Sequence, residues 1–262
     1  MRRYLRLLGI QLRASLLQTL QYRSDFGLDG LIAGFWTATA LIPLLVVFRG
    51  REGFAGWTYG EALLVTGWFA VVEGILQGAI NPSLTAVVEH IRKGTLDFVL
   101  LKPADAQFLV STAKFEPWRA VNVAAGFGLF VYAFVKMGHW PTVWGVLSAL
   151  LLLACAVAIL YSIWIATVSL AFRVVKIDNL TYLFGALFDA ARWPVNVFPP
   201  VIRFVFTFVL PLAVMTTFPA LALLSRLNAW TLALSLLGAA AASFLARTLW
   251  KASISRYTSA SS

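Results

Sequence analysis

A charged segment between two long apolar blocks contains the residues best suited to specific polar contacts. Residues 81–103 have the sequence NPSLTAVVEHIRKGTLDFVLLKP, and their ionisable side chains are Glu89, His90, Arg92, Lys93, Asp97 and Lys102. Placing so many charges in the apolar interior of a bilayer would be costly. The segment is therefore expected at a membrane surface, where its charged groups are available for polar contacts.

The same segment carries signals for the start and the end of helices. Asn81 and Pro82 favour a helix start, because asparagine caps helices and proline tolerates the first helical position. Gly94 can adopt the left-handed conformation that ends a helix, and Thr95 can cap a second short helix that ends at Pro103. The first helix would have an apolar face of Leu84, Val87, Val88 and Ile91. The pattern predicts two short amphipathic helices joined at a glycine, with a solvated interfacial loop as the alternative.

Glu73 is a carboxylate placed well inside a second apolar block, residues 61–80. A charge at that depth costs about 2.5–3.5 kcal/mol on insertion scales, so the side chain should face protein or water. It is therefore a candidate contact in a substrate pathway, together with Gln77, Trp36 and Trp68. The alternatives are that Glu73 is protonated or bonded to a neighbouring helix, and that the aromatic residues only pack between helices.

The sequence contains no motif typical of a catalytic or metal site. It has no GxxxxGK[ST] phosphate loop, no HExxH and no GxSxG. Cys155 is the only cysteine, and His90 and His139 are far apart in the chain, so neither a disulfide nor a Cys/His metal site is expected. We therefore expect a protein that is not an enzyme and binds no cofactor itself.

The composition indicates an all-α polytopic membrane protein. The chain has 262 residues, of which 60% are hydrophobic and 12% are charged, whereas a soluble domain carries about 25% charged residues. Its net charge of +10 does not require nucleic acid as a partner. The basic residues lie beside apolar blocks, and the anionic inner leaflet of a membrane is the simpler partner.

The stretch HIRKGTLDFVLLKP resembles the cytoplasmic signature I-[RK]-x-G-x-L-D-x-x-L-[LV]-[KR]-P of ABC-2-type transporter permeases. The matching residues, in order and spacing, are Ile91, Gly94, Leu96, Asp97, Leu101 and Pro103. These permeases are the membrane subunits of ATP-binding-cassette transporters. The resemblance implies a type V exporter-like fold and cytoplasmic coupling helices between the second and third spans.

In that family the loop between the second and third spans docks into a groove on a separate ATPase subunit, which binds ATP and Mg²⁺. The resemblance implies that Leu96, Phe98 and Leu101 form an apolar plug for the groove. Arg92 and Lys93 would contact its rim with Asp97, although Asp97 could instead cap its own helix. The implied coupling residues are Ile91, Arg92, Lys93, Gly94, Leu96, Asp97, Phe98, Leu101 and Pro103. A second copy or a related permease would complete the pathway.

Hydropathy and the resemblance together predict one transmembrane domain over residues 1–262 with six spans. Residues 1–24 would form an amphipathic helix in the cytoplasmic interface, the elbow helix of the family, because Arg6 and Arg13 interrupt any signal-peptide core. The expected spans are 26–48, 61–80, 118–137, 143–172, 177–197 and 229–250, with residues 81–103 as the coupling segment.

The fifth span is ambiguous in the sequence. Hydropathy favours residues 204–224, but Pro211 and Pro219 would break a helix there. The resemblance instead implies a span at 177–197 followed by a proline-broken re-entrant segment, 198–224. Broken backbone is tolerated at membrane depth only where protein or water satisfies it.

With six spans, 15 of the 21 lysine and arginine residues fall on one side. The positive-inside rule then places that side, both termini and the coupling segment in the cytoplasm of a cell with an inner membrane. The predicted function is a permease that exports a hydrophobic or amphipathic small molecule or lipid, which would be cationic if Glu73 lines the route. A secondary transporter and a non-transporting scaffold are the alternatives.

Overall fold

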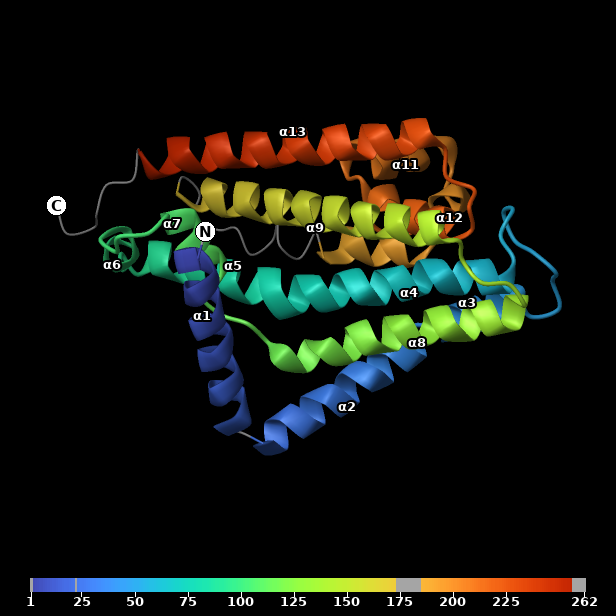
Figure 1. The fold of residues 1–262 in the computed structure, drawn as a ribbon, viewed down its shortest axis with the longest axis horizontal. Helices are drawn as coiled ribbons and strands as arrows, with labels where there is room; N and C mark the ends of the chain where they lie inside the picture. The colour runs from blue at the N-terminus through green and yellow to red at the C-terminus, as the bar shows by residue number, and fades with distance from the viewer. Residues whose placement is uncertain (1, 22, 173–184, 256–262) are drawn as a thin grey trace.

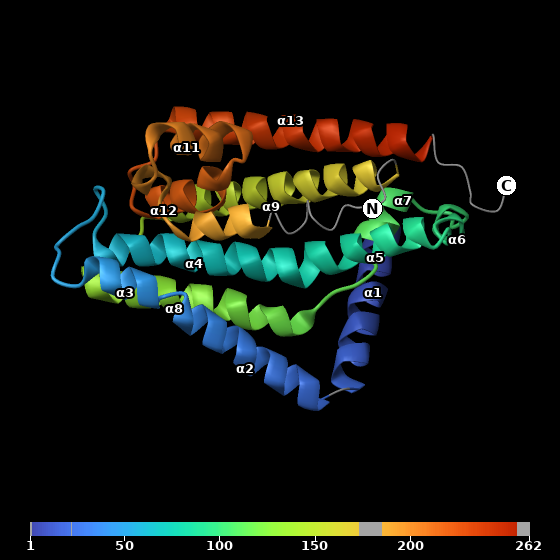
Figure 2. The ribbon, with the colours of Figure 1, turned by 180° about the vertical axis from the view of Figure 1, so that it is seen from behind.

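The computed structural model describes residues 2–21, 23–172 and 185–255, and these ranges are helical without a β-strand. Figures 1 and 2 show long helices side by side along one axis. The long helices are α1 (Arg2–Gln21), α2 (Arg23–Thr39), α4 (Tyr59–Ile75), α8 (Ala120–Met137), α9 (Val143–Ala171) and α13 (Ala229–Ile254). The short ones are α3 (Ile42–Phe48), α5 (Asn81–Arg92), α6 (Asp97–Leu100), α7 (Ala106–Ser111), α11 (Pro200–Phe204) and α12 (Phe218–Leu223).

Five helical runs in the described residues are long and apolar enough to cross a membrane, and a bent pair of helices raises this number to six. The five runs are Gly30–Phe48, Tyr59–Arg92, Pro117–Met137, Val143–Leu170 and Ala229–Ile254. They confirm an architecture with several apolar, membrane-compatible helices, and each overlaps one of the stretches predicted as the first four spans and the last.

The apolar block at 204–224 does not form one straight helix. Its parts, Pro200–Val209 and Ala213–Leu223, meet at an angle of 78°. Pro211 causes this break, because it has no N–H to donate and keeps the preceding Leu210 out of the helical conformation, at φ −116° and ψ 81°. The predicted fifth span, 177–197, lies partly outside the described residues. Its described part consists of a short helical stretch that ends before Trp193 and the single turn Val195–Val197, with Pro194 between them.

The first span is interrupted near its middle. Helix α2 ends at Thr39, and α3 begins at Ile42 with Pro43 in its first turn. Because Pro43 cannot donate a backbone hydrogen bond, the chain turns at residues 40–41. The α2 part diverges from the other helices in both views, and α1 runs across the direction of the bundle (Figures 1 and 2).

The second span is longer than expected, and Asn81 does not cap a new helix. The chain is helical from Tyr59 to Arg92, because α4 passes through the π-helical turn η1 (Leu76–Ile80) directly into α5. The Asn81 side chain contacts neighbouring helical residues instead: it accepts a hydrogen bond from Trp164 at 3.0 Å and donates one to Gln77 at 3.0 Å. The predicted pair of helices lying along the surface is therefore wrong for α5, which continues the direction of the span.

Glycines allow α4 and α8 to pack unusually closely. Helix α4 is the central helix, and nearly all of its residues are buried. A Cβ at Gly126 of α8 would lie 2.6 Å from the carbonyl oxygen of Gly67, and one at Gly74 would lie 2.7 Å from Val123. Gly78, one turn further along the chain, likewise lies close to Arg119, because a Cβ there would be 3.1 Å from the Cβ of Arg119.

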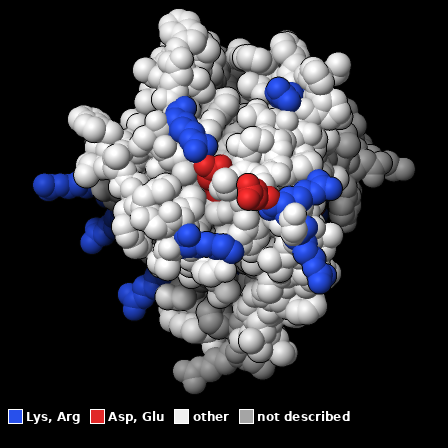
Figure 3. All heavy atoms as spheres, turned by 90° about the vertical axis from the view of Figure 1, so that its right-hand side faces the viewer, with Lys and Arg blue, Asp and Glu red and all other residues white. Residues whose placement is uncertain are grey.

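The two ends of the bundle differ, and we name them by their helices. The α6 end carries α6, α7 and the beginning of α1, and the α3 end carries the loops on the opposite side (Figure 1). Figure 3 shows the α3 end, where basic side chains are scattered over a mostly uncharged surface. At this end Glu61 forms a capping box with Thr58 at the start of α4. The Glu61 carboxylate also forms an ion pair with Arg226 at 2.8 Å.

Candidate functional site

The turn after α5 has the geometry expected for Gly94. Gly94 has a φ of 65°, and the N–H of Thr95 donates to the carbonyl of His90 at 2.9 Å while that of Gly94 donates to Ile91 at 3.2 Å. These two bonds form a Schellman motif, which ends a helix sharply. Thr95 does not cap α6, because its hydroxyl contacts the His90 ring at 2.8 Å and the residue before α6 is Leu96. This corrects the expected role of Thr95.

The apolar side chains of the motif divide into an exposed pair and a buried residue. Phe98 is 70% exposed and Leu101 is 81% exposed. Leu96, by contrast, is fully buried in the chain's own core. The expected plug therefore has two members, and Leu96 instead anchors the segment from inside, because a residue already covered by its own chain cannot enter another protein.

Charged residues surround the exposed pair. Arg92 and Lys93 are exposed at the end of α5, and Lys93 pairs with Glu89 at 3.2 Å. Asp97 is the first residue of α6, where a negative charge suits the helix dipole. Ile91 is half-buried beneath them, and Pro103 lies just beyond α6 at an exposed position.

Helix α1 rests on the segment that follows α6. Arg3 donates a hydrogen bond to the carbonyl of Pro103, and the Tyr4 ring packs edge-on against Phe108 with centroids 4.8 Å apart. Further along, Thr112 donates to Gln11 at 2.6 Å. The amphipathic helix and the motif segment therefore form one continuous surface at the α6 end.

A polar cluster behind that surface was missed by sequence reasoning. Asp105 accepts two hydrogen bonds from the Arg247 guanidinium, which also donates to Gln107. Gln107 donates to the Tyr161 hydroxyl at 2.9 Å, and Ser111 contacts the same hydroxyl at 2.7 Å. The one local signal in the sequence is an aspartate just after the helix-ending Pro103, which is typical of a helix cap.

The ionisation of Asp105 is fixed by this cluster. The hydrogen bonds from Arg247 lower the pKa of Asp105 below its ordinary value, and the Phe108 N–H also lowers it, while partial burial opposes them. A carboxyl with a lowered folded-state pKa stabilises the fold above its unfolded pKa and loses that contribution only as the pH falls through the lowered value. The ion pair with Arg247 therefore persists throughout the neutral range.

A cavity of about 760 Å³ lies between the first three spans and Arg192. Of the candidate pathway residues, Trp36 and Glu73 line it. Trp68 does not, because it is buried against Phe130 with ring centroids 4.9 Å apart. Gln77 does not line the cavity either; its side-chain oxygen accepts a hydrogen bond from the side-chain amide of Asn81. The structure thus brings together two of the four predicted residues.

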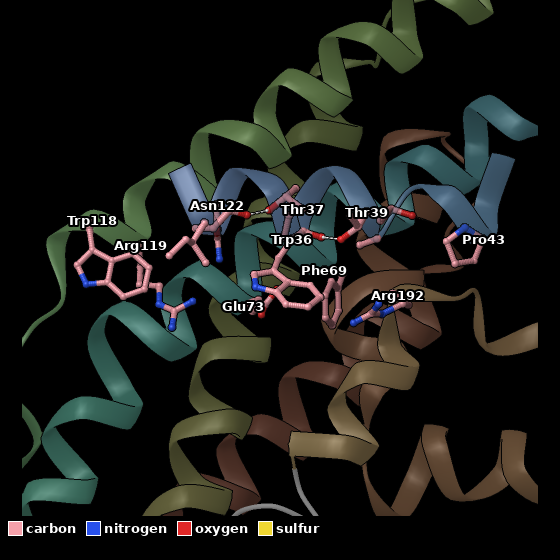
Figure 4. Close-up of a pocket in the computed structure, with 15 residues that line it drawn as sticks. Trp36, Thr37, Thr39, Pro43, Phe69, Glu73, Trp118, Arg119, Asn122 and Arg192 are labelled. Atoms are coloured by element: carbon pink, nitrogen blue, oxygen red, sulfur yellow. Dashed lines mark hydrogen bonds between the residues drawn. The ribbon is translucent and has the colours of Figure 1, made fainter. Parts of the chain in front are cut away.

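Glu73 lies near the like-charged Asp189 and near two arginines, and it has no hydrogen-bond or ion-pair partner among the described residues. Figure 4 shows it between Arg119 and Arg192, with the Trp36 and Phe69 rings beside it. Arg119 and Arg192 interact with Glu73 electrostatically, but no hydrogen bond or ion pair joins them to it within the described part of the chain. Arg192 instead pairs with Asp189 at 2.8 Å.

Two further polar atoms of the cavity residues make no hydrogen bond within the described part of the chain. They are the side-chain oxygen of Asn122, which is only 3% exposed, and the buried Nε of Arg119, whose nearest charged partner is Glu116 at 3.8 Å. Unpaired buried polar groups are costly, at about 1–3 kcal/mol each. The cavity therefore combines aromatic walls with an unpaired carboxylate, an amide oxygen and a guanidinium N–H, which suits an amphipathic ligand whose polar end donates and accepts hydrogen bonds.

Within the described ranges, no group of three or more His, Cys, Asp and Glu side chains is placed to hold a metal ion.

No curated protein matches the chain in sequence. A family model described as ABC-2 family transporter protein matches residues 35–261, which include the exposed motif, most of the first candidate span and all of the other four. The resemblance found in the short motif therefore extends over nearly the whole chain. The chain belongs to the ABC-2 transporter family and is a multi-pass membrane permease.

Proposed function

We propose that the chain forms half of the substrate pathway of an ABC transporter and is driven by separate ATPase subunits docked at the α6 end. The observation that carries this proposal is the exposed pair Phe98 and Leu101 beside the Gly94 turn. Exposed apolar side chains of this size suit a partner's groove better than contact with water. ATP and Mg²⁺ would be bound by that partner.

The continuous helix from Tyr59 to Arg92 provides the mechanical link. Its α5 part ends at the proposed docking surface, and its α4 part carries Glu73 and Phe69 into the cavity. A run of 34 residues is about 51 Å long, whereas the apolar core of a bilayer is about 30 Å thick. Helix α5 would therefore project from the membrane and carry movement of the ATPase to the cavity.

The cavity would be one half of the pathway. Exposed apolar side chains on α2, among them Leu31, Phe35 and Trp36, flank it, and a second copy or a related permease would cover them around a two-fold or pseudo-two-fold axis. The bent pair 200–223 would be a re-entrant element at the α3 end, and the α6 end with both termini would face the cytoplasm of the inner membrane. The substrate would be an amphipathic small molecule or lipid moving outward.

The main rivals are a secondary transporter and a scaffold. A secondary transporter is expected to show two half-repeats with broken helices at matching positions. In the described residues the sharply bent pair occurs once, at Pro200–Val209 and Ala213–Leu223, which favours the ATP-driven reading.

Purification of the tagged chain from its native host in mild detergent tests the proposal. We expect mass spectrometry to identify a co-purifying ATPase with a GxxxxGK[ST] motif, and any second permease would be found in the same sample. Recovery of the chain alone, under conditions in which other membrane complexes stay intact, would reject the ATPase-driven function.

Replacing Glu73 with glutamine tests the pathway. Inverted vesicles holding the complex would be assayed for ATP-dependent uptake of cationic, zwitterionic and neutral amphipathic fluorophores. A hydrogen bond to a charged group contributes about 1.5–3 kcal/mol, so we expect uptake of cationic members to fall by at least about tenfold. The control is Glu52→Gln in an exposed loop. Equal uptake of the cationic fluorophores by both variants would show that Glu73 does not contact the substrate in the pathway.

A further inference from the structure

Helix α7 is tied by side chains to three elements that are distant in the sequence. Asp105, at its N-cap, binds Arg247 of α13, and Gln107 and Ser111 both contact Tyr161 of α9. The backbone N–H of Asp105 also contacts the Tyr4 hydroxyl of α1 at 3.3 Å. Because α7 follows α6 after five residues, this cluster stands directly behind the exposed motif surface.

The Asp105 carboxylate serves two functions at once. Its Oδ1 accepts from the Phe108 N–H at 3.0 Å, which caps α7, and it also accepts from Arg247 Nη1 at 3.2 Å. Its Oδ2 accepts from Arg247 Nη2 at 2.5 Å. A two-pronged contact between a guanidinium and a carboxylate fixes orientation as well as distance. The direction of α7 is thereby fixed relative to α13.

The pair is too exposed to be needed for folding. The side chains of Arg247 and Asp105 are 39% and 35% exposed, and ion pairs at such positions typically contribute about 0–1 kcal/mol to stability. Helix α13 is held to the bundle independently, because Ala239, Ala246 and Trp250 are buried and the helix packs mainly on α9. Loss of the pair would thus loosen the link between α7 and α13 without unfolding the chain, while the contacts of α7 with Tyr161 and Tyr4 remain.

We propose that Asp105 and Arg247 are positioning residues that make the segment carrying α6 and α7 move as one body with the last span, α13. The proposal rests on the proposed function for its consequence, which is that movement of a docked ATPase reaches α13 as well as α4. The clamp itself is a property of this chain alone.

The test measures a distance between two spin labels. Cysteines would replace the exposed Lys102 and Lys251 in a background in which the lone Cys155 is changed to alanine. Pulsed electron paramagnetic resonance would record the label distance in lipid nanodiscs, first for the chain alone and then for the complex with and without ATP and vanadate. For the parent chain we expect a narrow distribution of label distances, and we expect that nucleotide does not change it.

Three variants discriminate the clamp from general loosening. Arg247→Gln should broaden the distribution and let it shift with nucleotide, whereas Arg247→Lys, which keeps the charge, should restore most of the narrow peak. Arg226→Gln breaks the ion pair at the α3 end and should leave the peak unchanged. Thermal unfolding of all three should match that of the parent.

A distance distribution that stays narrow in Arg247→Gln would overturn the proposal. The proposal would also fail if Arg226→Gln or Arg247→Lys broadened the distribution as much as Arg247→Gln does. The measurement on the chain alone keeps the two proposals separate. Absence of an ATPase partner would reject the proposed function, while the label distance would still decide whether the clamp exists.

Discussion

Replacing both Phe98 and Leu101 with aspartate should abolish recovery of an ATPase subunit with the chain and leave the chain folded. Both side chains are largely exposed, so the substitutions remove no contact in the core. Central apolar residues of an interface often contribute about 2 kcal/mol or more each. Losing two would weaken binding by roughly a thousandfold. Co-purification and thermal unfolding of the same preparation provide the two readouts.

Leu96→Ala is the matched control, because Leu96 lies in the same motif but is fully buried. Truncating a buried leucine costs about 2–5 kcal/mol of stability, so this variant should unfold at a lower temperature. If the aspartate variant instead lost its fold, or if it retained the ATPase, the exposed pair would not be the docking surface.

Replacing Gly126 with alanine should destabilise the chain more than the addition of one methyl group suggests. The new Cβ would lie 2.6 Å from both the Gly67 carbonyl oxygen and a methyl group of Val71. Backbone atoms cannot move aside as a flexible side chain can, so α4 and α8 would have to separate. Overpacking of this kind costs about 1–3 kcal/mol, which in a chain of this size lowers the melting temperature by roughly 2–10 °C.

The same helix provides the control for that prediction. A Cβ at Gly128 would meet nothing within 4 Å, so Gly128→Ala should be neutral or slightly stabilising, since alanine favours helix formation. Thermal unfolding in one detergent compares the two variants directly. Equal melting temperatures would show that the close approach of α4 and α8 does not limit stability.

The features that the sequence predicted well are those governed by local rules. Long apolar runs predicted the spans at 118–137 and 143–172, because hydropathy and helix length are properties of the run itself. Gly94 was predicted because its left-handed φ is a local requirement. Pro211 predicted the break that bends the 200–223 segment.

The errors arose where distant residues compete for the same groups. Asn81 has the local pattern of a helix cap, but Trp164 of α9 uses its side-chain oxygen, and the π-helical turn lets the chain continue. Leu96 reads as part of an apolar plug, yet the chain's own core covers it. Neither competitor is visible within a local window.

The Asp105–Arg247 pair was missed for a related reason. Its members are 142 residues apart, and each has an ordinary local interpretation, one as a helix cap and the other as a basic residue near the end of a span. The cavity was predicted only in part. The position of Glu73 deep in an apolar block can be seen in the sequence, but Asn122 and Arg192 are brought to the cavity only by the fold.

The π-helical turn within the second span has a mechanical consequence. The turn is tied to the chain before α8, because the carbonyl oxygen of Gly78 accepts a hydrogen bond from the Glu116 N–H at 2.8 Å, and Gly74 just before the turn touches α8. If this is the fulcrum, the arms are unequal: about 26 Å from Leu76 to Tyr59 and about 18 Å from Ile80 to Arg92. A sideways push at α5 would then be magnified about one and a half times at the far tip. That tip carries the capping box of Thr58 and Glu61, so the start of the helix at the α3 end would move furthest.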